Sequence, residues 1–198
     1  MKSLPAGWLA EEAANYLRTA VAQVAGLEGD FLEIGSLFGR SSVTLGEPIK
    51  KLKGKLWCID TWDMGVCTEL AKRLPADASY KPTWKEDGTT PLDTFKANIA
   101  AAKLKVVVRP LIGTAADYLP GWDKPLRFIF VDGNHAYEAV REDAQWRKFL
   151  VKGGIIAFHD YTNYTIPSVK RAIDDEMNGD ENFEFVAMAQ SIKAFRRK

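Results

Sequence analysis

The sequence lacks most of the features that mark the special classes of protein. It has only two cysteines, Cys58 and Cys67, in 198 residues, which excludes a disulfide scaffold. No apolar run approaches the ~20 residues of a membrane-spanning helix, and acidic residues near the N-terminus replace the apolar stretch of a signal peptide. Its 27 basic and 26 acidic residues leave a formal net charge of +1. That balance gives no general reason to expect nucleic acid or an anionic membrane as a partner.

The composition that remains is that of an ordinary globular protein. Apolar residues make up 46% of the chain and charged residues 27%, which argues against a disordered, collagenous or coiled-coil chain. The length suits one domain with a sizeable core. We therefore expect residues 1–198 to form a single domain of a soluble, cytoplasmic protein.

Short apolar runs alternate with segments of helical period along most of the chain. The predicted strands are 31–34, 56–59, 106–108, 128–131, 155–158, 183–187 and 192–195, and the predicted helices are 8–25, a short one from 41, 92–102, 136–150 and 167–177. Strands that are apolar throughout favour a parallel sheet covered on both faces. The final strand pair breaks the alternation, so we expect an α/β fold with a mostly parallel seven-stranded sheet and one antiparallel edge strand.

Three local features add to this pattern: the start of the second helix, an irregular segment and a charge pair on a later helix. Ser41 and Ser42 are typical N-cap residues for the second helix, and Gly46 and Pro48 are expected to break it early. Residues 63–91 fit neither period and are interpreted as an irregular, cap-like insertion that roofs the site. Its Tyr80 and Trp84 would stack on a ligand ring or, as exposed loop aromatics more often do, pack the loop down. Asp143 and Arg147 have the spacing of an ion pair on an outer helix face.

Polar residues follow four of the predicted strands, which is where ligands of such sheets bind. They are the loop from Gly35 to Ser41, Asp60, the Asp132–His135 segment and the His159–Asp160 pair. The only two histidines of the chain belong to this set. The carboxyl edge of the sheet is therefore the expected site of any chemistry.

The loop from Gly35 to Ser41 has the composition of an anion-binding turn. Its glycines permit a tight turn and close approach of a ligand, and free N–H groups at the next helix favour an anion. Its spacing matches neither a Walker A loop nor a dinucleotide fingerprint. Asp60, after the second strand, is placed to bind the two hydroxyls of a ribose. The alternatives are a simple strand–helix turn and a solvated acid.

Asp132, His135, His159 and Asp160 form the chemically richest set. An aspartate, a histidine and another aspartate at adjacent strand ends are suited to a divalent metal ion. His135 has the chemistry of a general base near neutral pH. The alternatives are that His135 only caps the following helix and that His159 is a hydrogen-bonded core residue.

Taken in order, these motifs resemble those of class I S-adenosylmethionine-dependent methyltransferases. The segment Glu33–Ser42 is similar to their first motif, in the form found in the catechol O-methyltransferase-like branch, and segments 130–138 and 153–161 are similar to the motifs after strands four and five. The similarity covers about residues 28–178 and is closest to macrolide-sugar O-methyltransferases and cephalosporin-hydroxylase-like proteins. It implies a Rossmann-like methyltransferase fold.

The resemblance also implies roles for individual residues. Glu33 and the Gly35–Gly39 backbone would lie along the methionine part of the cofactor, Ser41 would hold its carboxylate, and Asp60 with Thr61 would bind its ribose. Ala115 and Ala116 would contact the adenine. The cofactor-binding set implied is Glu33, Gly35, Ser36, Gly39, Ser41, Asp60, Thr61, Ala115, Ala116 and Asp132.

The implied reaction is methyl transfer to a hydroxyl oxygen of a small molecule such as a sugar, a polyol or a phenol. Asp132, His159 and Asp160 fall where metal-dependent relatives have three ligands, and His135 where sugar-modifying relatives have the base. His159 departs from the usual Asp or Glu, which shifts preference from magnesium toward manganese, iron or zinc, or means that no metal binds. The alternatives are a cofactor-binding module without activity and a nicotinamide-dependent dehydrogenase. A homo-oligomer is left open.

Overall fold

Seven strands form one sheet in the order β3-β2-β1-β4-β5-β7-β6 in the computed structural model, which describes residues 4–74, 84 and 88–198. The strands are β1 (Asp30–Ile34), β2 (Leu56–Asp60), β3 (Val108–Ile112), β4 (Leu126–Val131), β5 (Leu150–Phe158), β6 (Phe183–Ala189) and β7 (Ile192–Arg197). β1 to β5 are parallel to one another. β7 lies between β5 and the edge strand β6 and runs antiparallel to both. The predicted α/β fold with a mostly parallel sheet is confirmed.

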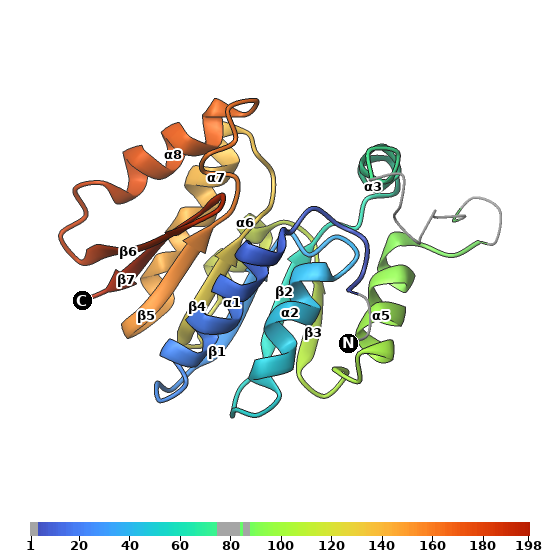
Figure 1. Cartoon of the computed structure of the whole chain (residues 1–198), viewed down its shortest axis with the longest axis horizontal. Helices are drawn as coiled ribbons and strands as arrows, with labels where there is room; N and C mark the ends of the chain where they lie inside the picture. The colour runs from blue at the N-terminus through green and yellow to red at the C-terminus, as the bar shows by residue number, and fades with distance from the viewer. Residues whose placement is uncertain (1–3, 75–83, 85–87) are drawn as a thin grey trace.

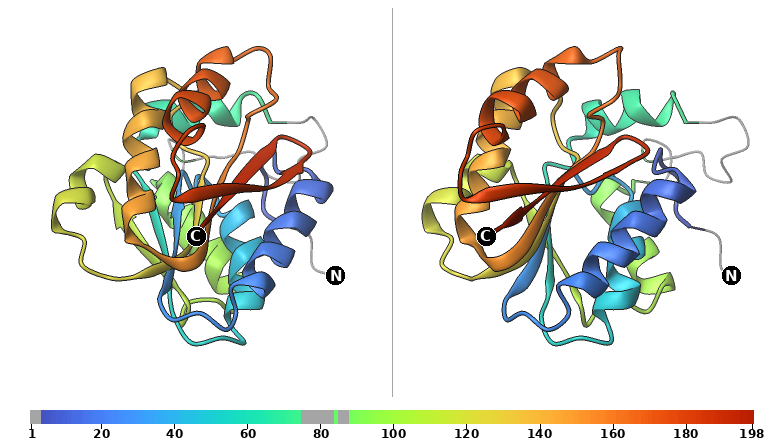
Figure 2. Two further views of the ribbon diagram at one scale, coloured as in Figure 1. Left: turned by 90° about the vertical axis from the view of Figure 1, so that its left-hand side faces the viewer. Right: turned by 60° about the vertical axis from the view of Figure 1, so that its left-hand side comes forward.

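Helices cover both faces of this sheet (Figures 1 and 2). One face carries α1 (Glu11–Gln23), α2 (Arg40–Ile49) and α5 (Pro91–Ala101), and the other carries α6 (Ala115–Tyr118), α7 (Tyr137–Ala144) and α8 (Pro167–Met177). Two short 3₁₀ segments, η1 (Leu119–Gly121) and η2 (Gln145–Phe149), follow α6 and α7. Side chains of a strand alternate between the faces, so Phe31 joins the core under α1 and Leu32 the core under α8.

The order of the strands decides where the carboxyl ends meet. β1 lies between β2 and β4, and the chain leaves it toward the first face, whereas it leaves β4 toward the second. The crevice outside the carboxyl ends at such a switch point is the usual ligand site of open α/β sheets. Among the described residues, no helix combines the length and apolar character needed to cross a bilayer.

Helix α2 differs from its prediction at both ends. Gly39 is its N-cap, and Ser41 and Ser42 lie inside the first turn with buried side chains, so neither is a cap. The helix also continues through Gly46 and Pro48 to Ile49. Burial explains this, because nearly the whole of α2 packs in the core and a Cβ at position 46 would lie 2.8 Å from Leu104 Cδ1. Close packing outweighs the weak helix propensity of these residues.

The segment predicted as an irregular insertion contains a helix in its described part. α3 (Met64–Ala71) begins after Asp63, whose carboxylate accepts a hydrogen bond from Val66 N at 2.9 Å. Trp84 is buried against Phe38, with ring centroids 5.5 Å apart, and donates to Thr94 Oγ1 at 2.8 Å. The Trp84 ring therefore packs into the domain, whereas Tyr80 lies outside the described residues.

Two further expectations need correction. β3 begins at Val108, two residues later than predicted, and Val106 is exposed. Asp143 does not pair with Arg147, because the Asp143 side chain is buried under Gly133. Arg147 instead pairs with Glu176 in α8 and with Asp180 just after that helix. The helical period of 136–150 is real, but η2 tightens its second half.

Candidate active site

The loop after β1 passes so close to β4 that its first residue has no room for a side chain. Gly35 has φ +85°, and a Cβ there would lie 2.1 Å from the carbonyl oxygen of Asp132. Gly39 has φ +88° at the start of α2. Both glycines are therefore required by the backbone, and the loop brings the Glu33 and Asp132 segments together.

Asp60 holds this loop in place. Its Oδ2 accepts hydrogen bonds from the backbone N–H of Ser36 at 2.9 Å and of Leu37 at 2.8 Å, and its Oδ1 accepts from Trp62 N at 2.8 Å. A carboxylate has about four lone-pair positions, so three are used by the protein and one on Oδ1 remains. Asp60 thus positions the glycine loop and keeps capacity for one ligand hydroxyl, fewer than the sequence suggested.

Glu33 is fully buried and turned toward α2. Its Oε2 accepts from Ser36 Oγ at 2.7 Å, from Ser42 Oγ, and from Cys58 Sγ at 3.3 Å, while Oε1 has no partner. Burial raises the pKa of Glu33, and the surrounding hydroxyls oppose that shift. Because the carboxyl group faces the protein, its contribution to any ligand site runs through the position of the loop.

The N-terminus of α2 is open to an anion. Gly39 cannot supply a capping side chain, no side chain caps the helix, and the first turn contains no acidic residue. The first amides of a helix lack acceptors within the helix and favour a negative group. Ser41, the predicted carboxylate-binding residue, lies in this first turn.

The residues predicted to bind ribose and adenine are less uniform. Thr61 is exposed, and its Oγ1 accepts from Asp63 N at 3.3 Å. Ala115 is buried in the core beneath α6, whereas Ala116 is exposed on the first turn of that helix. Thr114 caps α6 with Asp117 as its capping-box partner. Of the two alanines, only Ala116 presents its methyl group to solvent.

The structure brings Asp132, His159 and Asp160 together as predicted. One ligand atom of each lies within 4.8 Å of the others. His159 Nδ1 is 3.3 Å from Asp132 Oδ1 and 3.2 Å from Asp160 Oδ2. This atom is buried and makes no hydrogen bond of normal geometry, so the imidazole nitrogen and two carboxylate oxygens face a common point. Such a mixed set fits a divalent transition metal ion.

The electrostatics of this cluster are strongly coupled. Burial by itself would lower the pKa of His159, but the carboxylates of Asp132 and Asp160 outweigh it and raise that pKa to about 10. Burial would raise the pKa of Asp160, yet hydrogen bonds from both histidines hold it well below its usual range. A pair of carboxylates thus demands a positive charge here, either a proton or a metal ion.

His135 lies at the mouth of the cluster. Its Nε2 is 3.1 Å from Asp160 Oδ2, and its side chain is 41% exposed. The N-cap of α7 is Ala136 with no side-chain bond, so His135 is not a cap of that helix. The hydrogen bond to Asp160 raises the pKa of His135. The carboxylates of Asp160 and Asp132 thus favour the protonated form of this ring.

Sequence reasoning missed the contribution of the C-terminal hairpin. The turn between β6 and β7 places Ser191 Oγ 3.1 Å from His159 Nε2. Because β7 pairs antiparallel with β5, matching Phe158 with Lys193, this turn meets the carboxyl end of β5. The predicted final strand pair contained that signal, but only the register identifies the residue.

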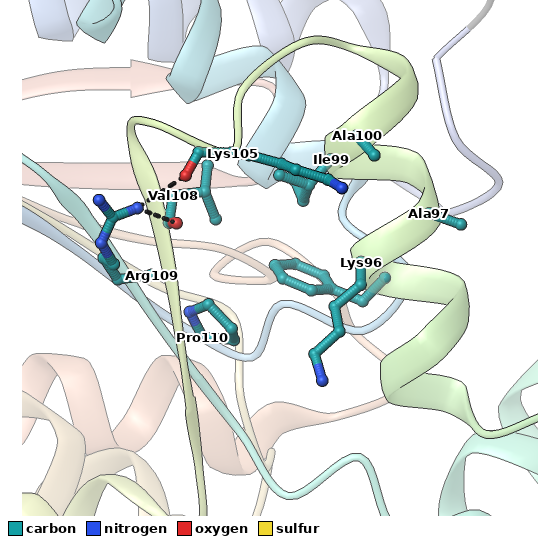
Figure 3. A pocket seen from close by; sticks show the side chains of 9 residues that line it. Lys96, Ala97, Ile99, Ala100, Lys105, Val108, Arg109 and Pro110 are labelled. Atoms are coloured by element: carbon teal, nitrogen blue, oxygen red, sulfur yellow. Dashed lines mark hydrogen bonds between the residues drawn. The ribbon is translucent and has the colours of Figure 1, made fainter.

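A groove on the first face lies apart from these residues. It has a volume of about 470 Å³ between α5 and the start of β3 and is lined by residues such as Phe95, Lys96, Lys105 and Arg109. Figure 3 shows the Arg109 guanidinium turned to the backbone carbonyls of Lys105 and Val108. None of the predicted site residues lines it.

Comparison with known proteins agrees with the fold. Residues 32–161 match the model of a family described as "Methyltransferase domain". Among solved structures, the O-methyltransferase NovP aligns with a TM-score of 0.71 and 19% identity, over 94% of this chain and 80% of its own. An O-methyltransferase from Bacillus cereus in complex with SAH aligns with a TM-score of 0.68 and 18% identity, over 98% and 84%.

A third similar structure is the O-methyltransferase TomG from Streptomyces achromogenes, which is described as involved in tomaymycin synthesis and in complex with SAM. It aligns with a TM-score of 0.69 and 16% identity, over 96% of this chain and 82% of its own. At these identities the likeness establishes the fold. The family match runs from Leu32 in β1 to Tyr161. It therefore includes the glycine loop and the cluster of Asp132, His159 and Asp160.

Proposed function

The chain belongs to the methyltransferase domain family, and from that premise we propose that it transfers a methyl group from S-adenosylmethionine to a hydroxyl oxygen of a small molecule. The observation that carries the proposal is the clustering of His135 with Asp132, His159 and Asp160 beside the glycine loop. This cluster supports His135 as an acid–base residue near the loop that would bind the cofactor. Sugars, polyols and phenols are the acceptor classes to test.

The glycine loop fits the cofactor. The uncapped first turn of α2, with Ser41 in it, would bind the carboxylate of the methionyl group. The free lone pair of Asp60 Oδ1 would accept from a ribose hydroxyl, and Ala116 would lie against the adenine. The cofactor supplies an electrophilic methyl group on a sulfonium, so the remaining task of the protein is to place and activate the acceptor oxygen.

Asp132, His159 and Asp160 are proposed to hold a divalent ion, with manganese, iron or zinc preferred over magnesium because one donor is an imidazole nitrogen. A divalent ion in this place would lower the pKa of an acceptor hydroxyl. The orphaned His159 Nδ1 between two carboxylates is the observation that supports this site.

His135 is proposed to remove the proton from the acceptor. A carboxylate only accepts hydrogen bonds, so Asp160 Oδ2 fixes the proton of the neutral ring on Nε2. The lone pair is then on Nδ1, which takes the acceptor proton. Asp160 also stabilises the imidazolium that forms, which is the usual role of the acid that orients a catalytic histidine.

We further propose that residues 1–198 act as one domain, since one sheet gathers strands from both ends of the chain.

The cofactor is tested by calorimetry with S-adenosylhomocysteine and with NAD. We expect binding of the former only. Asp60→Ala should weaken it by about 1–3 kcal/mol, because polar groups lose their partners, while Asp63→Ala, which removes the helix cap three residues away, should leave it unchanged. Tight NAD binding without S-adenosylhomocysteine binding would refute the proposal. Turnover on a panel of sugars, polyols and phenols then separates an enzyme from a cofactor-binding module.

A further inference from the structure

We propose that Ser191, in the turn between β6 and β7, is a positioning residue that sets the tautomer of His159 and so readies the metal site. The inference rests on the proposed metal site. It adds a part of the chain that lies outside the strand-end motifs and outside the matched residues 32–161.

The turn is docked firmly on the segment that carries the proposed ligands. Tyr161 N donates to the carbonyl oxygen of Ser191 at 2.9 Å, and the Ser191 side chain is buried. Two residues after Ser191, in β7, Lys193 Nζ lies 2.9 Å from Asp174 Oδ1 and 3.1 Å from Tyr161 Oη. These bonds tie β7, α8 and the residue after Asp160 together, so Ser191 has little freedom to move away from His159.

The hydrogen bonds of Ser191 determine which nitrogen of His159 carries the proton. Ser191 Oγ donates its single proton to Gln190 Oε1 at 2.7 Å. Toward His159 Nε2, 3.1 Å away, the same oxygen can therefore only accept, and Nε2 must be the protonated nitrogen. A neutral imidazole has one N–H, so when an ion displaces the second proton of His159 the lone pair is on Nδ1, the atom that faces Asp132 and Asp160.

This arrangement matters because a metal ion binds the lone pair of an imidazole. In the other tautomer a proton on Nδ1 would occupy the place of the ion. Partners of the second ring nitrogen commonly fix the tautomer of metal-binding histidines, and their removal typically costs 10–100-fold in metal affinity. Gln190, Ser191 and His159 thus form a directed chain of hydrogen bonds that ends at the proposed ion.

The test uses zinc, a diamagnetic ion, with the chain of residues 1–198. In calorimetric titration, Ser191→Ala should weaken zinc affinity about 10–100-fold. Ser191→Thr keeps the hydroxyl group and should keep the zinc affinity of the wild type. Gln190→Ala should weaken affinity too, because it frees the serine proton to turn toward Nε2, whereas Gln190→Glu keeps the acceptor. Thr162→Ala is the matched control: it removes an exposed hydroxyl that donates to the backbone carbonyl of Gln190 at 3.4 Å, leaves the Gln190 and Ser191 side chains in place, and should bind like wild type.

Nitrogen-15 NMR of the imidazole rings gives the second readout, and it is simple because the chain has only two histidines. In the zinc-loaded protein we expect the His159 proton on Nε2. Unchanged affinity in folded Ser191→Ala would overturn the inference and leave the metal site standing. A proton on Nδ1 in the zinc-loaded protein would mean that this nitrogen does not bind the ion, and would overturn both. No zinc binding by wild type, or binding that survives His159→Ala, would overturn the metal site and the inference together. Melting temperatures establish that each variant is folded.

Discussion

Asp160 Oδ2 is the atom at which the two histidines meet, 3.1 Å from His135 Nε2 and 3.2 Å from His159 Nδ1. Asp160 also has φ +58°, in the left-handed region that aspartate tolerates better than most residues. Unusual backbone conformations concentrate at functional sites. The proposed base and the proposed ligand set therefore depend on one side chain held in an uncommon conformation.

His135→Ala tests the base. We expect kcat to fall about 10²–10⁴-fold, the usual contribution of general-base catalysis, while S-adenosylhomocysteine affinity barely changes. Asn134→Ala is the control, since the exposed Asn134 side chain accepts from Ala136 N at 2.9 Å in the adjoining turn. Turnover largely kept in His135→Ala, with a lowered melting temperature, would mean that His135 is structural.

Asp143 is a buried acid, and no basic side chain contributes to its pKa. Burial raises its pKa to about 7, with a smaller contribution from Glu142. Because this folded-state pKa lies above the unfolded value, the protein loses stability as the pH rises from about 4 through 7. We expect Asp143→Asn to stabilise the protein by about 1–3 kcal/mol at pH 8 and much less at pH 4.

Urea unfolding at both pH values measures this difference. Glu142→Gln, the exposed neighbouring acid on α7, should show little change at either pH. Equal stability of wild type and Asp143→Asn at pH 8 would mean that the Asp143 carboxylate has a compensating partner when ionised.

At the scale of elements, the junction between β1 and α2 is the most constrained part of the site. Asp132 N donates to Ile34 O at 2.8 Å, and the next residue, Gly35, passes against the Asp132 carbonyl. The turn is thus built against backbone, which cannot move aside as a flexible side chain would. This contact fixes the distance between the glycine loop and the cluster of Asp132, His159 and Asp160.

Gly35→Ala should lower the free energy of unfolding by about 2 kcal/mol or more, from the positive φ and the 2.1 Å approach of the new Cβ to a carbonyl oxygen. S-adenosylhomocysteine affinity should fall with it, because the loop must shift. Gly121→Ala is the matched control, since a Cβ there meets nothing within 4 Å. Similar denaturation midpoints for the two variants would contradict this account of the turn.

At the scale of the whole molecule, the proposed ion would join β4, β5 and, through Ser191, the terminal hairpin. A ligand that binds only the folded state stabilises it by about 2.7 kcal/mol at 100 times its Kd. We expect manganese or zinc to raise the melting temperature and EDTA to lower activity. His159→Ala should abolish the thermal shift. Full activity in excess EDTA, with no metal in the purified protein, would remove metal assistance from the proposal.

Methyltransferase family membership also selects among the enzyme classes that the sequence allows. Residues 32–161 match a methyltransferase domain, which agrees with the methyltransferase interpretation and not with a dehydrogenase. The missing dinucleotide fingerprint and the order of the strand-end motifs favour the same choice. Fold and family are predictable from the sequence because strand–helix alternation and strand-end motifs are local patterns.

The local sequence is a poorer guide wherever packing outweighs propensity. Gly46 and Pro48 are weak helix formers, yet α2 continues through them because its side chains are buried. Asp143 has the spacing of a surface ion pair, yet it faces Gly133 and the core. For α2 the deciding contact comes from Leu104, a residue far away along the chain.

The sequence by itself determined the mostly parallel sheet and the placement of Asp132, His159 and Asp160 at the carboxyl ends of neighbouring strands, because strand–helix alternation and right-handed crossovers leave few other topologies. Only the tertiary structure decided that Asp60 binds the loop backbone, that Glu33 faces inward, and that His135 turns to Asp160. It also placed Ser191 on His159. The physical reason is that the direction of a side chain depends on hydrogen-bond partners brought near by folding, which sequence spacing does not specify.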